Sequence, residues 1–524
     1  MAGNLSPGGD GLLLSWIEPG LAAKTFRLRF SRWRAGSWSP PLTVVSGTAL
    51  VVNWADVPSV REAADGALIA HWAERRDEES HATVVMLGRS TDGGKTWKPL
   101  GQAHDDDTQT EHGFVSLLPE GPAVRAFWLD GRQQQGGLRH RGAMSLRTAE
   151  VSERVAASEV LDTSVCDCCG TAAAMTAKGP IIVFRDRHVG EIRDVSIIRR
   201  EGGGWTAPKA VSEDGWKIPG CPVNGPAVAA EGSRVAVAWF TYAGGRAAVK
   251  VAFSTDAGAT FSVPVEVDGP RGRAAPIGRV AVVLDKDAAL VSWMVSDRER
   301  AEILVRRVVS GGRRSAPLVL AQSQSDRESG FPRLSRSDRQ LFLAWTQAGA
   351  PSRLRFQAWP LSAVPAATEL PEEPAPPAAL PLAVGTVMPA YSARTLEGKV
   401  VDVTSLRGHP VLLNFWATWC EPCRMELPEL VKLHRRLAPR GLVVVGVSLD
   451  SGRTPEQVKA FAARRDVGYA LLVDSDDLAS RILGISTLPV TVLIDAKGAI
   501  AWSQTGAIVP DDPGLAAALE RSLR

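Results

Sequence analysis

Short apolar strands that end in an aromatic residue recur along the first 360 residues. Segments such as GLLLSW, ALIAHW and LFLAW are typical of buried strands, and turn sequences such as DG or EG separate them from a preceding apolar segment. The closing aromatics follow one another at intervals of 52 to 56 residues: Trp16, Trp72, Trp128, Phe184, Trp239, Trp293 and Trp345. Two further strands usually follow each copy. The pattern therefore predicts an all-β propeller of about seven blades over residues 1–360.

The seventh copy lacks an outer strand, because RLRFQAWPL runs directly into a stretch rich in proline and alanine. Closed propellers often complete the last blade with a strand from the N-terminus, but Leu5 already belongs to the first blade. We therefore expect that further residues precede Met1, among them a closing strand and a signal peptide. Residues 361–384 have no periodicity and are predicted to form an extended linker.

The pattern changes after the linker, over residues 385–524. VLLNFWA (411–417) predicts a buried strand, and residues 424–437 carry an apolar stripe that predicts a helix. Cys420 and Cys423 lie at this strand-to-helix junction, which is typical of a redox-active pair. Unpaired N–H groups and the dipole of the helix stabilise a thiolate at Cys420, and Cys423 can then release the product from a mixed disulfide. A zinc site is disfavoured because it needs about four ligands and this region has no second cysteine pair.

Residues 385–506 resemble the TlpA/ResA-like branch of the thioredoxin superfamily, the periplasmic thiol–disulfide reductases. The matching pieces are LEGKVVDVTSLRGHPVLLNFWATWCEPCRMELPEL, LVVVGVSLD, LGISTLPVTVLIDAKG and IAWSQTG. The resemblance implies an α/β thioredoxin-like domain over 385–524 that needs no cofactor. It also implies the roles of five site residues: Trp419 shields the disulfide, Cys420 is the nucleophile, Cys423 resolves, Glu426 takes part in proton transfer, and Pro489 is cis.

The resemblance further implies protein thiols or disulfides as substrates, an upstream thiol–disulfide electron donor and an extracytoplasmic, periplasmic location. Glu421 and Glu426, as anions, would disfavour a thiolate at Cys420, which predicts a reductant rather than an oxidant. Lys plus Arg (60) nearly balance Asp plus Glu (57), which disfavours nucleic acid as a partner. The sequence contains no run of about 18 apolar residues, so no transmembrane helix is predicted. The first residues, MAGNLSPGGDG, do not resemble a signal peptide.

A second cysteine cluster lies in the predicted propeller. Cys166, Cys168 and Cys169 precede the fourth repeat, and Cys221 precedes the fifth, at the same distance from Trp239 as Cys166 is from Phe184. Three interpretations remain open: disulfides that join adjacent blades, a Zn²⁺ or Cu(I) site, or a redox pair that exchanges with Cys420 and Cys423. A disulfide and a metal site both predict that Cys166 and Cys221 converge near the propeller axis.

Two segments, STDGGKTW (90–97) and STDAGATF (254–261), resemble the Asp-boxes of the sialidase superfamily. This resemblance supports a sialidase-like propeller, since the box is a structural turn and not a catalytic site. The segment FRDRHVGEIRDV (184–195) carries charges that suggest a binding site, and the alternative interpretation is a solvated hairpin. A sialidase-like propeller that binds or cleaves glycans, with an accessory redox domain, is the alternative function. The single propeller tyrosine, Tyr242, does not match the sialidase nucleophile, so sialidase activity is disfavoured.

Overall fold

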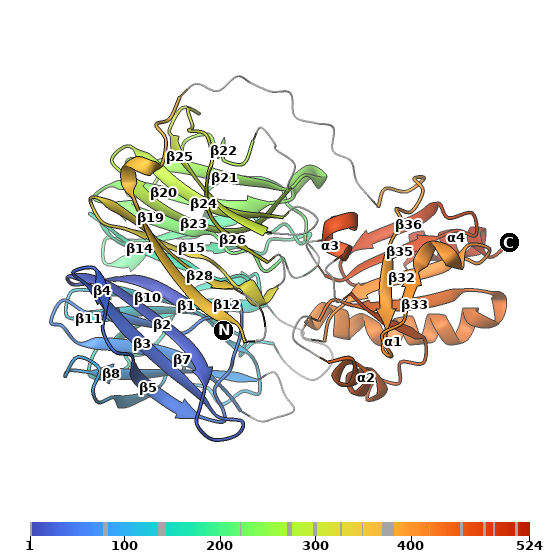
Figure 1. Ribbon diagram of the computed structural model, residues 1–524, viewed down its shortest axis with the longest axis horizontal. Helices are drawn as coiled ribbons and strands as arrows, with labels where there is room; N and C mark the ends of the chain where they lie inside the picture. The colour runs from blue at the N-terminus through green and yellow to red at the C-terminus, as the bar shows by residue number, and fades with distance from the viewer. Residues whose placement is uncertain are drawn as a thin grey trace. The chain divides into compact units, whose positions relative to one another are not determined.

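The computed structural model contains seven small antiparallel sheets in residues 3–368 and one mixed sheet with helices in residues 382–524 (Figure 1). Each of the two units is described by itself. None of the helices in the described part of the chain combines the length and the apolar character needed to span a lipid bilayer. The structure describes residues 3–76, 82–134, 143–218, 220, 222–269, 275–296, 301–324, 327–347, 349, 351–368, 382–418, 420–450, 454–474, 478–485, 488–508 and 512–524.

The seven sheets are the blades of a propeller, which confirms the prediction from the repeat. The first three blades consist of β1 (Gly3–Gly8), β2 (Gly11–Pro19), β3 (Phe26–Arg34), β4 (Ser37–Trp38) and β5 (Leu42–Gly47); β6 (Ser59–Glu62), β7 (Leu68–Arg75), β8 (Thr83–Ser90) and β9 (Lys98–Gln102); and β10 (His112–Glu120), β11 (Ala123–Asp130), β12 (Met144–Val151) and β13 (Glu159–Val165). Within each blade, successive strands pair antiparallel, as in an up-and-down meander.

Three further blades have the same order, and the seventh has three strands in the described residues, as predicted. They consist of β14 (Ala172–Thr176), β15 (Gly179–Arg185), β16 (Val195–Glu201), β17 (Gly204–Trp205) and β18 (Lys209–Ala210); β19 (Ala227–Glu231), β20 (Arg234–Thr241), β21 (Ala248–Ser254) and β22 (Val265–Glu266); β23 (Ala275–Asp285), β24 (Ala288–Ser296), β25 (Ala301–Val309) and β26 (Leu318–Ser323); and β27 (Arg333–Arg336), β28 (Gln340–Gln347) and β29 (Arg353–Pro360). Short 3-10 turns occur at Ala243–Gly245 and Arg327–Ser329.

The repeated aromatics pack between neighbouring blades, as the repeat predicted. Trp128 contacts a cluster with Ile69 and Leu87 of the second blade, and Trp239 joins Val183 of the fourth. A single sheet has two faces to cover, so each blade buries its apolar residues only by stacking on the next one. The Trp128 indole N–H donates to Asp130 two residues later, at 3.0 Å, which satisfies the polar atom that burial would otherwise leave without a partner.

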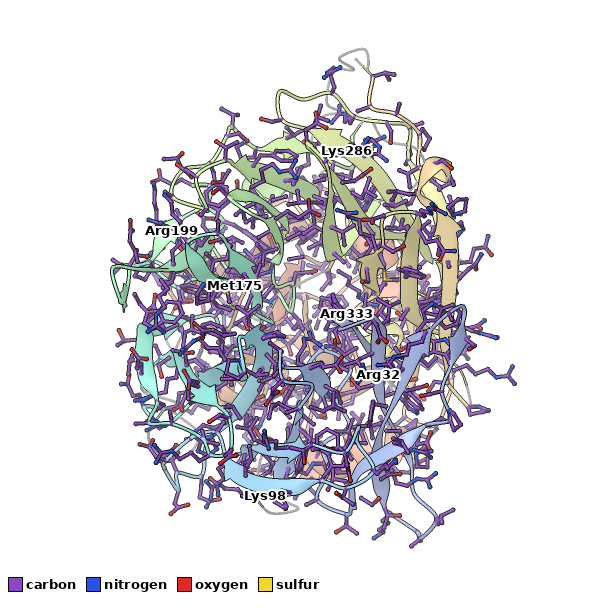
Figure 2. All side chains as sticks on the ribbon, turned by 90° about the vertical axis from the view of Figure 1, so that its left-hand side faces the viewer. Arg32, Lys98, Met175, Arg199, Lys286 and Arg333 are labelled. Atoms are coloured by element: carbon purple, nitrogen blue, oxygen red, sulfur yellow. A yellow bond between two sulfur atoms is a disulfide. The ribbon has the colours of Figure 1, made fainter. Side chains whose placement is uncertain are left out.

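The first and seventh blades pack against each other and close the ring. Leu5 and Leu14 of the first blade share one apolar cluster with Phe342 and Phe356 of the seventh. Figure 2 shows the sheets arranged around a common centre, with Arg333 near the middle and Lys98 at the rim. Closure covers the apolar faces that the first and seventh blades would otherwise leave exposed.

The two S-x-D-x-G segments form tight turns with matching hydrogen bonds. Ser90 Oγ donates to Asp92 Oδ1 at 2.8 Å and accepts from the Gly94 amide at 2.9 Å. Ser254 makes the equivalent bonds to Asp256 and Gly258, at 2.7 and 2.9 Å. Gly94 has φ +90°, a conformation that favours glycine. These side chains form hydrogen bonds within the turns, which is consistent with a structural role for both segments.

Gly225, at the start of the fifth blade, lies directly against Gly170, at the start of the fourth. A Cβ built on Gly225 would lie 2.0 Å from the Gly170 carbonyl oxygen, whereas a Cβ on Gly170 meets no atom within 4 Å. We expect Gly225→Ala to destabilise the propeller by about 3 kcal/mol, the upper end for overpacking, because backbone must move. Gly170→Ala is the matched control and should be nearly neutral in thermal unfolding. Equal melting temperatures for the two variants would contradict this contact.

The segment that we assigned to the linker begins with residues that belong to the propeller. Residues Leu361–Ala363 form a 3-10 turn, and Val364 is buried in a cluster with Leu343. Thr368 exchanges two backbone hydrogen bonds with Arg314, at 3.1 and 3.2 Å. Residues 361–368 are therefore part of the first unit. Most of the remaining predicted linker, residues 369–381, lies outside the described residues.

The C-terminal unit is a seven-stranded mixed sheet with helices. Its strands follow the order β31 (Val400–Asp402), β30 (Ser392–Thr395), β34 (Ala470–Val473), β33 (Val443–Ser448), β32 (Val411–Trp416), β35 (Val490–Ile494) and β36 (Ile500–Thr505). Its helices are α1 (Glu421–Leu437), α2 (Pro455–Ala463), α3 (Leu478–Leu483) and α4 (Pro513–Ser522), with 3-10 turns at Val403–Leu406 and Ala438–Arg440. Strands β32, β33 and β34 are parallel and β35 runs antiparallel to β32. All six residues of β32 are buried, as expected for a central strand.

Candidate redox site and propeller cysteine cluster

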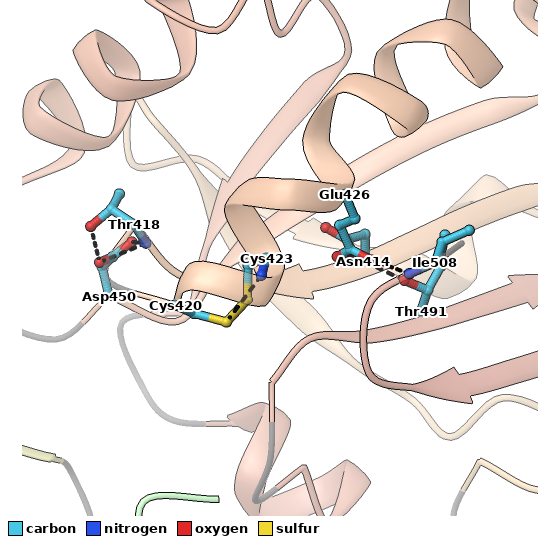
Figure 3. The surroundings of a disulfide bond; sticks show 8 residues. All are labelled: Asn414, Thr418, Cys420, Cys423, Glu426, Asp450, Thr491 and Ile508. Carbon is cyan, nitrogen blue, oxygen red and sulfur yellow. Dashed lines mark hydrogen bonds between the residues drawn. A yellow bond between two sulfur atoms is a disulfide. The ribbon is translucent and has the colours of Figure 1, made fainter. Parts of the chain in front are cut away.

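Cys420 and Cys423 lie where the central strand β32 passes into helix α1. Cys420 is the N-cap of α1, and Pro422 occupies the first turn, where a missing N–H breaks no helical bond. The two cysteines form a disulfide with Cα atoms 5.3 Å apart, and the Cys423 amide donates to Cys420 Sγ at 3.3 Å (Figure 3). The structure therefore places the pair at a helix N-terminus, as the sequence predicted.

Asp450 holds the loop that precedes the cysteines. It follows β33, is buried, and accepts hydrogen bonds from the Thr418 amide at 3.0 Å and from the Thr418 hydroxyl at 2.6 Å. The Ser448 hydroxyl also donates to Asp450, at 2.7 Å. The role of Asp450 was not predicted from the sequence. A Ser-x-Asp sequence at the carboxyl end of a buried parallel strand could have indicated it, because functional sites of such sheets lie at those strand ends.

Pro489 follows a cis peptide bond, as predicted, and immediately precedes β35. Leu488 is fully buried and shares an apolar cluster with Cys420 and Cys423. The Pro489 carbonyl accepts a hydrogen bond from the Gly506 amide at 2.7 Å, which holds the start of β35. Trp419, the predicted shield of the disulfide, lies outside the described residues.

Glu426 is buried beneath the helix start and is not a surface residue. Its two carboxyl oxygens accept hydrogen bonds from Asn414 Nδ2 at 2.7 Å and from the Ile508 amide at 2.8 Å (Figure 3). Burial raises the pKa of Glu426 to about 8, and these two hydrogen bonds offset the effect only partly. Asn414, a polar residue inside the apolar strand VLLNFW, was the sequence signal for this buried pair and was missed.

One prediction about Glu426 was wrong. We reasoned from sequence that its negative charge disfavours a thiolate at Cys420. With a pKa of about 8 the carboxyl is mostly neutral at pH 7, so it exerts little charge effect there. The burial of both sulfurs among apolar side chains disfavours the thiolate instead.

Three of the four propeller cysteines, Cys166, Cys168 and Cys169, lie close together within one turn. Cys166 Sγ and Cys169 Sγ are 3.2 Å apart, and the sulfurs of Cys166, Cys168 and Cys169 all lie within 4.8 Å of one another. Burial alone would raise the pKa of Cys166, but hydrogen bonds from Cys168 and Cys169 and the charge of Arg193 lower it well below its ordinary value. Burial raises the pKa of Cys169. Cys221 lies outside the described residues, so its approach to Cys166 stays a prediction.

The charged segment 184–195 is solvated only around its tip, so the solvated-hairpin interpretation was wrong for its buried arginines. Arg185 is buried and donates to the backbone carbonyls of Asn224 and Phe240, at 2.9 and 2.8 Å, which joins the fourth and fifth blades. Arg193 is buried against Cys166, and Glu191 accepts from it at 2.7 Å. Periodicity could not show this burial, because alternation within one strand does not reveal what an adjacent blade covers.

A buried histidine pair lies at the start of the third blade. His104 and His112 stack at 3.9 Å between ring centroids. Burial and neighbouring His112 lower the pKa of His104, whereas Asp130 and Asp106 outweigh burial and raise the pKa of His112. Arg132 contacts both carboxylates, Asp130 at 2.8 Å and Asp106 at 3.2 Å. Because these side chains bond to one another and to Arg132, we assign this cluster to packing.

A cysteine pair at a strand-to-helix junction, with a cis-proline before the adjacent antiparallel strand, defines the C-terminal unit as a thioredoxin-like domain. Residues 384–503 match the AhpC/TSA family. Thioredoxin-like protein YneN of Bacillus subtilis is 38% identical over 117 residues, which cover 22% of this chain and 68% of that protein. Through this domain the chain belongs to the family of thioredoxin-like proteins.

Further relatives match the same region. The thiol-disulfide oxidoreductase ResA of Geobacillus thermodenitrificans is 33% identical over 131 residues, which cover 25% of this chain and 74% of ResA. Among solved structures, a putative thiol:disulfide interchange protein DsbE from Chlorobium tepidum is 26% identical, covers 27% of this chain and 99% of that chain, and has a TM-score of 0.25. These matches concern the C-terminal domain.

Proposed function

We propose that this protein reduces disulfide bonds in protein substrates through Cys420 and Cys423. The observation that carries the proposal is the disulfide at the N-terminus of α1, where Cys420 caps the helix. The similarity to ResA, a thiol-disulfide oxidoreductase by name, supports the same activity. The two cysteines themselves carry the electrons, so the domain needs no cofactor for this reaction.

In the proposed cycle the reduced Cys420 thiolate attacks one sulfur of a substrate disulfide. That S–S bond breaks, a mixed disulfide forms, and the leaving substrate thiolate takes up a proton. Cys423 loses its proton and attacks Cys420 Sγ, which releases the second substrate thiol and leaves the Cys420–Cys423 disulfide. Two electrons and two protons pass to the substrate, and an upstream dithiol returns them.

Glu426 is the candidate group for the proton of Cys423. It lies one turn further along α1 (Figure 3), and its pKa of about 8 is close to the operating pH of a thiol exchange reaction. A carboxyl with such a pKa can both accept and return a proton near neutrality. Asn414 and the Ile508 amide hold it in place by hydrogen bonds to its two oxygens.

The burial of the cysteines favours the role of a reductant. Both sulfurs are fully buried in an apolar cluster. Apolar surroundings disfavour a charged thiolate, and a less stabilised thiolate means a less stable reduced form and a lower reduction potential.

We therefore expect a reduction potential nearer to about −270 mV, the value of thioredoxin, than to about −120 mV, the value of a strong disulfide oxidant. Equilibration of the full chain with glutathione redox buffers, followed by alkylation and mass analysis of the 420–423 peptide, measures it. Following this peptide separates the pair from the propeller cysteines. A potential close to −120 mV would reverse the assignment as a reductant.

The activity itself is tested by insulin reduction. The full chain, recycled by dithiothreitol, should accelerate the precipitation of insulin chains well above the rate with dithiothreitol alone. A rate equal to that of dithiothreitol alone would contradict the proposed activity.

Because protein disulfides form outside the cytoplasm, we propose an extracytoplasmic, periplasmic location and a membrane-associated or soluble dithiol as electron donor. The propeller is proposed to bind the partner protein or a metal ion.

A further inference from the structure

The turn Cys166–Cys169 brings three sulfurs together between the third and fourth blades. It connects β13 to β14, and the Cys166 amide donates to the Arg185 carbonyl at 3.0 Å, which holds the start of the turn on the fourth blade. Cys166 and Cys169 are 1% and 2% exposed, whereas Cys168 is half-buried. Cys168 is therefore the most exposed residue of the three.

The spacing of the sulfurs fits a small ion better than it fits unrelated thiols. Cys166 Sγ and Cys169 Sγ are 3.2 Å apart, all three sulfurs lie within 4.8 Å, and none of the three is in a disulfide. Sulfurs that share one metal ion at about 2.3 Å lie about 3.8–4.0 Å apart. Side-chain shifts of less than about 1 Å would bring the three into that arrangement.

A buried guanidinium supports an anionic sulfur cluster at this turn. Arg193 Nη1 donates to Cys166 Sγ at 3.4 Å, and the same side chain is 3% exposed. Arg187 pairs with Asp167, inside the turn, at 3.3 Å, so the carboxylate beside the thiols is already bound to a cation. The turn therefore presents sulfur, and no free carboxylate, to an incoming ion.

The kind of ligand favours a soft ion. In the described part of the chain the possible ligands of this group are all sulfurs, with no histidine or carboxylate among them. Soft thiolates favour Cu(I), which carries a single charge and tolerates low coordination. We propose that Cys166, Cys168 and Cys169 bind one Cu(I) ion through three thiolates. The site lies in the propeller, so this inference does not rest on the proposed reductase activity.

The test uses the full chain with Cys221→Ser, Cys420→Ser and Cys423→Ser, so that the three cysteines of the turn are the only thiols left to bind the ion. The protein is reduced with a phosphine, desalted without oxygen and titrated with Cu(I) in competition with bicinchoninate, whose copper complex absorbs visible light. We expect one Cu(I) per chain to be taken from the chelator. Adding Cys168→Ser, at the half-buried position, should lower the affinity at least about 100-fold with unchanged circular dichroism and melting temperature.

X-ray absorption of the copper-loaded parent keeps the proposal testable even if the Cys168 variant fails to fold. We expect a first shell of three sulfurs. A nitrogen or oxygen shell, failure to compete with the chelator, or equal affinity in a folded Cys168→Ser protein would overturn the proposal. So would stronger retention of Zn²⁺ than of Cu(I), or a Cys166–Cys169 disulfide that the phosphine does not open.

Discussion

Replacing Cys420 by serine should abolish insulin reduction, because the hydroxyl cannot form the mixed disulfide that begins the exchange. Cys423→Ser should also stop turnover, but with a different product. Its Cys420 thiolate still attacks the substrate, and without a resolving thiol the mixed disulfide accumulates. Non-reducing electrophoresis of each variant after incubation with insulin distinguishes the two outcomes, since only Cys423→Ser should carry a covalently attached insulin chain.

The control for this pair is Lys432→Gln on the same helix, at a lysine side chain that is 73% exposed, which should retain parental turnover. Trapping by Cys420→Ser instead of Cys423→Ser would exchange the roles of the two cysteines. Full activity in the Cys420→Ser protein would show that another thiol performs the reduction. The N-cap position of Cys420 is the reason for assigning it the first attack.

The stability of the C-terminal domain should fall as the pH rises from about 4.5 to 8, because Glu426 is buried and neutral in the folded state. Its folded pKa of about 8 lies above its ordinary value of 4.5, so the folded protein binds more protons than the unfolded chain in this window. Stability is therefore fully present below pH 4.5 and is lost as the pH rises through 8, by up to about 1.4 kcal/mol per pH unit.

The variant Glu426→Gln cannot ionise and should remove this pH dependence from the unfolding transition of the domain in calorimetry. Glu429→Gln is the matched control, since Glu429 is on the same helix and pairs with Lys432 at 3.3 Å near the surface. It should leave the slope unchanged. A wild-type transition without a slope between pH 5 and 8, or an equal slope in Glu426→Gln, would show that Glu426 is already ionised in the fold.

The propeller could be predicted because its repeat has one physical cause. A four-stranded blade has apolar faces that it cannot bury alone, so each copy must carry the same apolar strands and a large residue at the same place. Phe184 and Trp239 follow that rule and both pack against the preceding blade. The three strands of the seventh blade could also be predicted, because its last apolar segment is followed directly by the proline-rich stretch.

The position of the redox pair at a helix start could also be predicted, because it depends on residues close in the sequence. Cys420 and Cys423 are one turn apart, and a helix start depends on residues within a few positions of it. The cis bond before Pro489 came from the family resemblance and not from local pattern, since the sequence Leu-Pro permits either isomer.

The amino-acid sequence by itself determined the seven-blade repeat, the redox pair at a helix start and the grouping of three propeller cysteines. Only the tertiary structure decided which charged residues are buried. Glu426 and Arg193 look like surface residues in their own segments, but Asn414 lies 12 positions before Glu426, and Cys166 lies 27 positions before Arg193. Burial and its effect on a pKa depend on what distant segments cover, and a pattern within one strand or helix does not contain that information.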